Sequence, residues 1–221
     1  MKVTVTDEIR LVCPAFVGAS IEATVENSAH SDGLWREIEA LSQSCRALLT
    51  TEQIKTMPSI AATRRIYRAC GKDPSRYRPS AEALLRRVLQ GKTLYRIDTV
   101  VDLINLASMA SGYSIGAFDA SKFVGDELRL GIGRDGEPYE GIGRGTINIA
   151  GLPVYRDAAG GVGTPTSDHE RTKVEAATRS LLVLVNGYDG DVQHVVDTAE
   201  HILRLLADYC SAGDGRYEIY R

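Results

Sequence analysis

Residues Cys70 to Arg87 read CGKDPSRYRPSAEALLRR, a segment that combines a cluster of cations, a rigid turn and the start of a helix. Proline suits the first turn of a helix, and the hydroxyl of Ser80 can accept a hydrogen bond from an unpaired backbone N–H. The sequence therefore predicts a helix that begins at Pro79 or Ser80 and ends at Gly91. The apolar residues expected to face the core are Leu84, Leu85, Val88 and Leu89. The arginines of this helix should then point outward.

The basic residues are concentrated around this segment. Between Lys55 and Arg96 there are eleven Lys or Arg residues and two acids, whereas the segments 1–54, 97–186 and 187–221 each carry a net charge of minus four. A protein with a net charge of −3 repels polyanions in general, so a nucleic acid would have to dock locally on the basic segment. The alternative is a solvated helical surface of a structural protein, whose arginines pair with acids from elsewhere in the fold.

The composition predicts a globular protein. With 43% apolar residues in 221, the chain can bury a substantial core, and we expect one compact unit over residues 1–221. Residues 1–8 lack the apolar run of an export signal, and no later stretch approaches the roughly 18 apolar residues of a membrane span. We therefore expect a soluble, cytoplasmic protein. The four cysteines are far apart without a C-x-x-C pair, which favours small core residues over a zinc site or a disulfide framework.

Apolar periodicity predicts the remaining elements. Alternating apolar and polar residues in the first 27 positions favour an antiparallel pair of strands, with a bend between Pro14 and Gly18. Helical spacing predicts a helix from Leu34 to Leu49, which Asp32 is expected to cap. Three further helices are expected from Pro58 to near Gly71, over about 98–110, and over 192–206.

Residues 112–186 have a different character, because they hold most of the glycines and show no helical period. The short runs that favour strands are Glu127 to Leu130, Thr146 to Ile149, Leu152 to Tyr155 and Leu181 to Val185. The sequence thus predicts an α+β fold, with helices packed on a mixed or antiparallel sheet and joined to a β-rich lobe. We expect a helical and strand lobe over 1–111, the β-rich lobe over 112–186, and a C-terminal helix in 187–221 that packs back. The cleft should lie between the lobes.

Two motif-like patterns have simpler explanations. Residues 131–136 read GIGRDG and match the dinucleotide-binding pattern by letter, but a Glu-Pro pair follows where a helix is needed, so a β-turn is expected. His194, Asp197 and His201 share a broad face of the last helix and could in principle hold a metal. No further strong ligand is nearby, so a solvated helix face is the better interpretation, and no metal or cofactor is expected.

A polar loop between Gly160 and Thr172 is the main candidate for a site. It contains three glycines followed by hydroxyls, acids, a histidine and an arginine: Thr164, Thr166, Ser167, Asp168, His169, Glu170 and Arg171. Such a loop can place donors, acceptors and a water around a small polar ligand, as hydrolysis of an activated ester requires. The alternative is a capped turn in which Asp168 pairs with Arg171. No G-x-S-x-G elbow or Cys/His pairing accompanies the loop, so covalent catalysis is not indicated.

A second candidate is the segment from Tyr113 to Asp119, which places aromatic and small residues beside a carboxylate. Such a mixture can form a pocket that stacks an aromatic side chain and binds an amine. The alternative is the edge of a core strand, with Asp119 capping the following turn.

These segments together resemble the editing module that forms the third and fourth domains of the bacterial phenylalanyl-tRNA synthetase beta subunit, in a stand-alone form. The resemblance covers roughly Trp35 to Val185. The segments that carry it are Gly71 to Leu84, Val101 to Asn105 with Ile115 to Asp119, and Thr166 to Thr172. The third segment is similar to stand-alone relatives rather than to the synthetase itself.

The resemblance implies a pocket between two lobes and a positioned water in place of a covalent nucleophile. In the synthetase, this module hydrolyses tyrosine that has been attached wrongly to the phenylalanine tRNA. Here it implies a protein that binds the acceptor end of an aminoacyl-tRNA and hydrolyses its ester in trans, without a cofactor. A chain of 221 residues encodes no ATP-binding core, so it should not charge tRNA. The alternative is a non-catalytic module that binds an amino acid or an RNA end.

Each candidate residue then receives an expected role. His169 and Glu170 would position or activate water, and Thr166 and Ser167 would bind the ester or the terminal ribose. Asp119 or Asp168 would hold the ammonium group. Tyr113 and Arg171 complete the expected substrate-binding set. The residues expected to contact RNA or the pocket rim are Arg64, Arg76, Arg78, Arg86 and Arg87.

Overall fold

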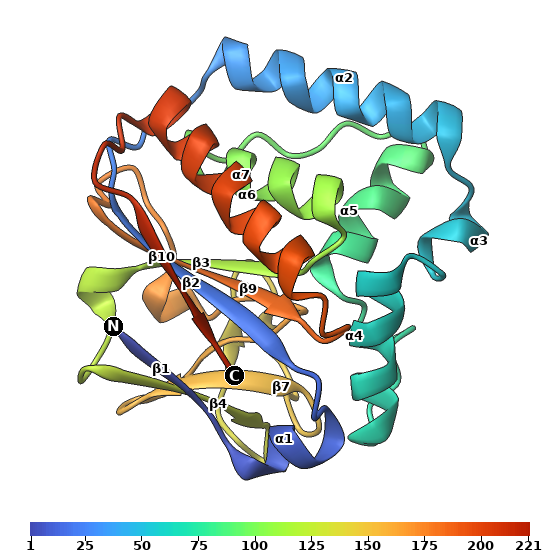
Figure 1. Cartoon of the computed structure of the whole chain (residues 1–221), viewed down its shortest axis with the longest axis vertical. Coiled ribbons are helices and arrows are strands. Elements are labelled where there is room, and N and C mark those ends of the chain that lie inside the picture. Colours follow the sequence, from blue (N-terminus) through green and yellow to red (C-terminus); the bar gives the residue numbers. More distant parts are fainter.

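The computed structural model describes all residues from 1 to 221 and has an α+β fold, as the sequence predicts (Figure 1). The elements in chain order are β1 (Lys2–Val5), α1 (Asp7–Val12), β2 (Val17–Thr24), α2 (Asp32–Leu48), α3 (Thr51–Ile54), α4 (Pro58–Ala69), α5 (Ser80–Leu89), α6 (Thr99–Ser111), β3 (Ile115–Asp119), η1 (Ala120–Lys122), β4 (Glu127–Ile132), β5 (Glu140–Gly141), β6 (Gly145–Thr146), β7 (Pro153–Asp157), β8 (Gly160–Gly163), η2 (Glu170–Thr172), β9 (Ser180–Gly187), α7 (Val192–Cys210) and β10 (Arg216–Tyr220).

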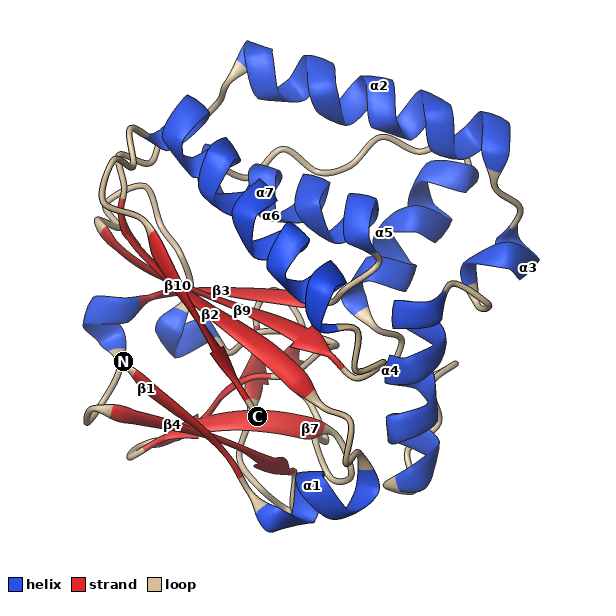
Figure 2. Cartoon of the chain, viewed as in Figure 1, coloured by secondary structure: helices blue, strands red, loops and turns tan.

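The elements form three layers. The central layer is an antiparallel sheet with the strand order β10-β2-β9-β3. Helices α2, α5, α6 and α7 cover one face of it, and a second sheet lies against the other face (Figure 2). The second sheet has the order β1-β4-β7-β8 and is mixed, because β1 pairs with β4 in parallel while the other pairs are antiparallel.

Strand β9 is buried on both faces. Its residues Leu181, Val183 and Val185 belong to a core of 34 buried residues on the helical side. The alternate residues Leu182 and Leu184 belong to a second core of 18 residues between the two sheets. Because successive side chains of a strand point to opposite faces, a strand with two cores needs a continuous apolar run. The predicted strand over 181–185 is confirmed for this reason.

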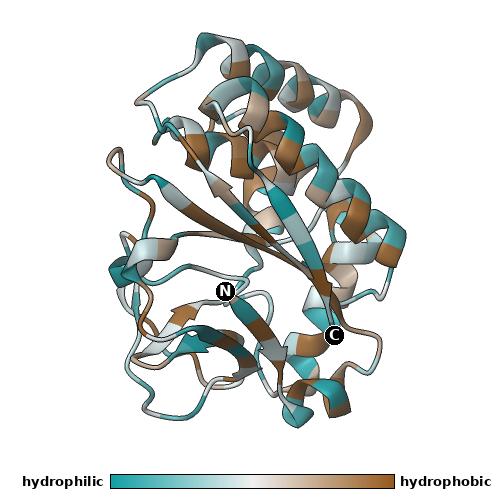
Figure 3. Cartoon of the chain, turned by 60° about the vertical axis from the view of Figure 1, so that its left-hand side comes forward, coloured by the Kyte–Doolittle hydropathy of each residue, from teal (hydrophilic) through white to brown (hydrophobic).

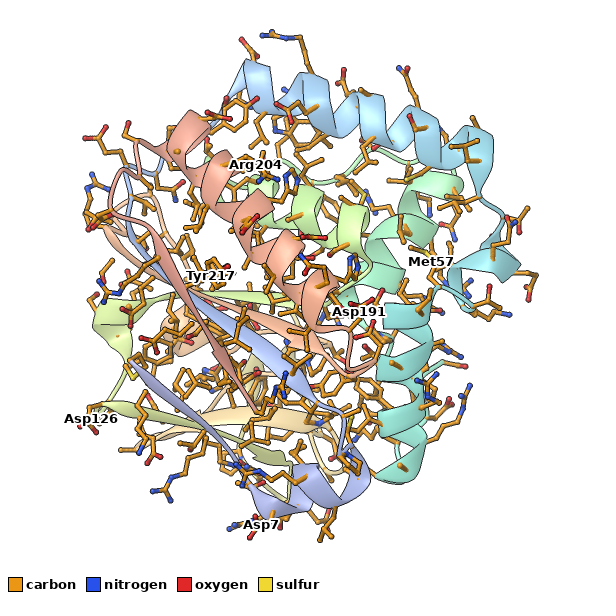
Figure 4. The ribbon with its side chains drawn as sticks, in the orientation of Figure 1. Asp7, Met57, Asp126, Asp191, Arg204 and Tyr217 are labelled. Carbon is orange, nitrogen blue, oxygen red and sulfur yellow. The ribbon has the colours of Figure 1, made fainter.

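Apolar side chains are concentrated between the layers, and polar residues follow the outer faces of the helices (Figure 3). With side chains drawn, the spaces between the ribbons are filled (Figure 4). Strand β2, from the first part of the chain, lies between β10 and β9 in the same sheet as β3. Strands from the first 111 residues and from residues 112–186 therefore pair in the same central sheet.

Two local expectations were wrong, and one strand was missed. Residues 9–13 were expected to form a strand, but Asp7–Val12 is helix α1, in which Ile9 is buried and Leu11 is 81% exposed. A helix this short contains too few residues to show a helical period, and two apolar residues spaced by two imitate a strand. Of the run 146–149, only Thr146 belongs to a strand, the two-residue β6. Strand β10 was not predicted.

Two helix starts differ from the expected caps. At α2, the hydroxyl of Ser31 rather than Asp32 accepts the cap hydrogen bond, from the N–H of Leu34 at 3.4 Å. Helix α5 begins at Ser80 as predicted, but its N-cap residue, Pro79, provides no side-chain cap, and the hydroxyl of Ser114 accepts from the N–H of Ala81 at 3.4 Å. The backbone N–H of Ser80 donates to the carbonyl of Pro165 at 2.8 Å. This bond joins the start of α5 to the polar loop.

None of the helices has both the length and the apolar character that crossing a lipid bilayer would require.

The second core should depend strongly on β9. Replacing Leu184, which is fully buried, by alanine should lower the free energy of unfolding by about 2–5 kcal/mol, because it removes apolar contacts and leaves a cavity. The matched change Leu48→Ala, at a leucine that is 76% exposed, should have an effect within about 0.5 kcal/mol. Urea unfolding followed by circular dichroism measures both, and equal effects would contradict the double burial of β9.

Candidate functional site

A pocket of about 450 Å³ lies where α6, the edge strand β3 and the polar loop meet. Its apolar wall consists of Ile97, Val101, Ile104, Ile115, Ala117, Ile142 and Val174. Its polar groups come from Ser80, Asn105, Ser108, Thr164, Ser167, Asp168 and Lys173. A volume of this size suits a small molecule, and a largely apolar wall with a few placed polar groups is typical of ligand sites.

Helix α6 and the polar loop form two sides of the pocket. Residues 97, 101, 104, 105 and 108 recur at helical spacing, so they share one face of α6 or of the segment that leads into it. The loop is fixed by the hydroxyl of Thr164, which accepts from the N–H groups of Thr166 and Ser167 at 3.3 and 3.1 Å. The same hydroxyl donates to the carbonyl of Ser167 at 2.9 Å. The loop is therefore a tight turn rather than a free segment.

Asp168 directs its carboxyl group toward the edge of β3. Its Oδ2 accepts a hydrogen bond from the N–H of Ala117 at 3.2 Å. A Cβ atom at Gly116 or at Gly163 would lie 3.2 or 3.0 Å from Oδ1 of Asp168, and closer still to the ring of Phe118. Glycine at these two positions thus leaves room for the carboxyl group. Burial raises the pKa of Asp168 to about 8, which the single N–H donor only partly offsets.

His169 lies next to Asp168 but is not part of the pocket lining. Both residues are in an extended segment that bridges to Gly163 and Gly141, so their side chains point to opposite sides. The Nδ1 atom of His169 accepts from the N–H of Arg171 at 3.0 Å, and its ring meets the ring of Tyr139 edge-on at 4.9 Å. Burial, and then the charge of Arg171, lower the pKa of His169, so the ring is neutral near pH 7.

The structure places the other loop residues in local contacts. Glu170 forms an ion pair with Lys173, and Arg171 forms a bidentate pair with Asp157, with both N–O distances 2.9 Å. Thr166 is buried, and its hydroxyl contacts the hydroxyl of Tyr67 at 2.8 Å. Of the polar residues named in this loop, Thr164, Ser167 and Asp168 line the pocket.

The residues predicted in the segment from 113 to 119 do not line the pocket. The hydroxyl of Tyr113 donates to Asp189 at 2.9 Å, and its ring packs against His194 at 4.7 Å. Asp119 accepts from the hydroxyl of Thr178 at 2.8 Å and caps the short helix η1. The pocket uses the alternate residues of β3, Ile115 and Ala117.

The basic segment is organised around one buried carboxylate. Glu82 is fully buried, and its oxygens accept from Arg64 and Arg86, each at 2.8 Å, while Nε of Arg78 lies 3.8 Å away. Arg64 is also buried. The arginines of α5 were predicted to point outward, but Arg86 is held by this carboxylate, as is Arg64 of α4.

The two other arginines expected to contact RNA lie against tyrosine rings. Arg76 lies 5.6 Å from the ring centroid of Tyr77. Arg87 lies 3.9 Å from the ring centroid of Tyr95, and its Nε donates to the carbonyl of Thr93 at 2.6 Å.

Sequence reasoning missed Asn105, Ser108 and Lys173 as pocket residues. A signal for the first two existed, because they are polar residues three apart on a helix whose other residues are mostly apolar. Lys173 carried no such signal, since only the bridge from Phe118 to Lys173 brings it to the pocket.

No group of three or more His, Cys, Asp or Glu side chains is arranged to hold a metal ion. In the predicted face of α7, His194 instead contacts the carbonyl oxygen of Ser111 through Nε2 at 2.9 Å.

The chain is an α+β protein with a pocket between a helix and a sheet edge. The sequence profile of the B3/4 domain family matches residues 62–211, so this chain belongs to that family. The family resemblance predicted from the sequence is thereby confirmed. A solved structure similar to this chain is an N-terminal fragment of the phenylalanyl-tRNA synthetase beta subunit from Pyrococcus horikoshii, at 14% identity and a TM-score of 0.49. The match covers 99% of this chain and 50% of that one. No curated protein matches.

The buried carboxylate of Glu82 should be important for stability. The substitution Glu82→Gln should lower the free energy of unfolding by about 3–5 kcal/mol, because it leaves the guanidinium groups of Arg64 and Arg86 without their counterion. The matched change Glu52→Gln, at an exposed pair with Lys55, should have a much smaller effect because solvent screens that pair. Chemical denaturation measures both values, and similar effects would contradict the buried cluster.

Asp168 should make stability depend on pH. Its pKa is raised in the folded protein, so the folded state binds more protons than the unfolded state between about pH 4 and pH 8. Its contribution to stability is therefore full below pH 4 and is lost as the pH rises through about 8. The free energy of unfolding of Asp168→Asn should fall less over this range than that of the unsubstituted protein. Parallel urea titrations at several pH values test this, and identical pH profiles would contradict the raised pKa.

Proposed function

We propose that the pocket binds the aminoacyl group of an aminoacyl-RNA and hydrolyses its ester in trans. The observation that carries this proposal is a carboxyl group, Asp168, set in a largely apolar pocket of about 450 Å³. Membership of the B3/4 domain family, together with the resemblance of the sequence to the phenylalanyl-tRNA synthetase editing module, supports a role related to tRNA. The proposed unit is the whole chain, residues 1–221, because both cores share the central sheet.

In this proposal, Asp168 holds the α-ammonium group of the substrate. A cation within hydrogen-bond distance favours the ionised carboxylate, so binding would lower the raised pKa of Asp168 and release a proton near neutral pH. The side chain of the amino acid would lie against the apolar wall that includes Val101, Ile104 and Ile115. Asp119, the other residue considered for this role, is already bound to Thr178 and Ser121.

The hydrolytic step needs a water molecule aimed at the ester carbonyl carbon. The water oxygen forms a new bond to the carbonyl carbon and the bond to the ribose oxygen breaks. One proton of the water goes to the ribose oxygen, which leaves as a hydroxyl group, and the other goes to solvent, so the amino acid leaves as a carboxylate. Asn105 and Ser108 of α6 and Ser167 of the polar loop are uncharged polar residues of the pocket lining. We assign the binding of this water to them. Orientation and a few hydrogen bonds supply the acceleration, so no covalent nucleophile is required.

That His169 and Glu170 position or activate the water stays a prediction from the sequence. Neither side chain lines the pocket, so direct participation requires the segment from 168 to 173 to rearrange when substrate binds.

A second candidate function is the binding of a free amino acid without turnover. The observation that favours it is the presence of Lys173 in the lining together with Asp168. A free amino acid has a carboxylate that Lys173 could pair with, whereas an ester has no such charge. Lys173 is engaged by Glu170 and lies 3.9 Å from Glu175, so the ligand would compete with these acids.

Release of labelled amino acids from a panel of correctly and wrongly charged tRNAs tests the proposal. Asp168→Asn should lower kcat/KM by at least about 30-fold, mainly through KM, because it removes the counterion of the ammonium group. The matched control is Asp135→Asn, at an exposed turn, which should leave turnover unchanged.

The outcomes separate the alternatives. A loss of turnover in His169→Ala with full activity in Asp168→Asn would assign the chemistry to His169 instead. No release from any tRNA would rule out the hydrolase, and calorimetric binding of a free amino acid that Lys173→Ala abolishes would then establish the binding module.

A further inference from the structure

A second hollow of about 490 Å³ lies between α2 and the segment from Lys92 to Ile97, which joins α5 to α6. We refer to it as the basic groove. Its charged residues are Arg46, Lys92, Arg96 and one acid, Glu39. Arg46 and Lys92 are exposed and make no ion pair, and Arg96 makes none with a carboxylate. This differs from the cluster around Glu82, where the arginines are neutralised inside the fold. The groove therefore presents cations that remain available to an anion.

Aromatic rings accompany these cations. The guanidinium of Arg96 lies 4.5 Å from the ring centroid of Trp35, and that of Arg87 lies 3.9 Å from the ring centroid of Tyr95. Tyr95 is 67% exposed even though Arg87 lies against one face, so part of its ring is free to stack on a flat partner. Tyr95 is not part of the groove lining but lies in the chain between Leu94 and Arg96, which are. Cations along a groove, with an exposed aromatic ring on the same segment, match the phosphates and bases of a single-stranded nucleic acid.

The groove segment is held in place from the core side. Leu94 is buried, and the N–H of Ile97 donates to Oδ1 of Asp102 at 3.2 Å. The other oxygen of Asp102 accepts from Nε1 of Trp35 at 2.6 Å. One buried carboxylate thus fixes both Trp35, in one wall of the groove, and Ile97. The aromatic and basic groups of the segment are presented by a fixed backbone, which reduces the entropy lost when a ligand binds.

The same segment joins the groove to the pocket. Arg96 lines the groove, and the next residue, Ile97, lines the pocket and is 57% exposed at its mouth. A single-stranded nucleic acid that lies along the groove would therefore bring one of its ends to the pocket.

We infer that the basic groove is the path of single-stranded RNA, with phosphates on Arg46, Lys92 and Arg96 and a base on Tyr95, so that the 3′ end reaches the pocket. This inference rests on the proposed function, because it supplies the RNA part of the same substrate. It moves RNA contact from Arg64 and Arg86, which Glu82 holds, to residues of α2 and the segment after α5.

The test measures binding of a short, unstructured, fluorescein-labelled single-stranded RNA to the full chain by fluorescence anisotropy. The double variant Arg46→Glu/Lys92→Glu should weaken binding by at least about tenfold at low salt, and the slope of log K against log salt should fall by about 1.4, or about 0.7 for each lost phosphate contact. The control Lys2→Glu/Arg204→Glu makes the same change in net charge at exposed cations on β1 and α7 and should keep both affinity and slope.

Tyr95 provides an independent arm. Tyr95→Ala should weaken RNA binding by about five- to hundredfold through lost stacking, whereas Tyr95→Phe should retain it. Equal losses in both double variants would indicate a general charge effect and overturn the groove. So would RNA affinity unchanged in the groove variant, or binding of a polyglutamate peptide with no binding of RNA.

The binding assay requires no catalysis, so the two proposals can fail separately. RNA affinity that depends on the groove, in a protein that releases no amino acid, would leave the groove and remove the hydrolase. Release of amino acids with RNA affinity independent of Arg46, Lys92 and Tyr95 would leave the hydrolase and remove the groove.

Discussion

The burial of β9 on both faces is the constraint on which the rest of the structure depends. Its alternate leucines and valines enter two cores, so helices must cover one face of the central sheet and a second sheet must cover the other. With β2 on one side of β9, the strand on its other side, β3, becomes the edge of the sheet. An edge strand has backbone groups that the sheet does not use. At β3, the N–H of Ala117 is given to Asp168. The position of the pocket is thus a consequence of the sheet order.

The spacing of apolar residues in the sequence predicted most of the long helices and the central strand β9. Long helices such as α7 show many turns of apolar spacing, and β9 shows the unbroken apolar run of a doubly buried strand, so both were found. Short elements fail for the same reason, because α1 has six residues and cannot show a period. The order of the strands was not predictable from the pattern, since pairing of β2 with β9 joins residues that are more than 150 positions apart.

The sequence predicted the loop of the candidate site and two of the residues that line the pocket, Ser167 and Asp168, but not the remaining ones. The grouping of polar residues after Gly163 correctly indicated the segment that meets the pocket, because glycine and hydroxyl residues favour tight turns. Successive side chains of an extended segment point to opposite sides, so the backbone register decides which of them enters the pocket. Asp168 points into the pocket, and His169, the next residue, points away from it. Similarly, the sequence shows that the segment from Lys55 to Arg96 is rich in cations. It does not show that Glu82 of α5 is buried, and this burial decides which arginines are bound to a carboxylate inside the fold.

Asp168 is half-buried at the pocket, and it differs from the fully buried carboxylates in how it is satisfied. Glu82 is bound by arginines, Asp157 by Arg171 with backbone N–H groups, and Asp102 by Trp35 and a backbone N–H. Asp168 accepts a single hydrogen bond, and glycine at two neighbouring positions keeps space around its other oxygen. A charge buried with so few partners is costly, which is why its pKa rises to about 8. That cost disappears when a cation enters the pocket, so the same feature that weakens the empty protein strengthens the binding of an ammonium group.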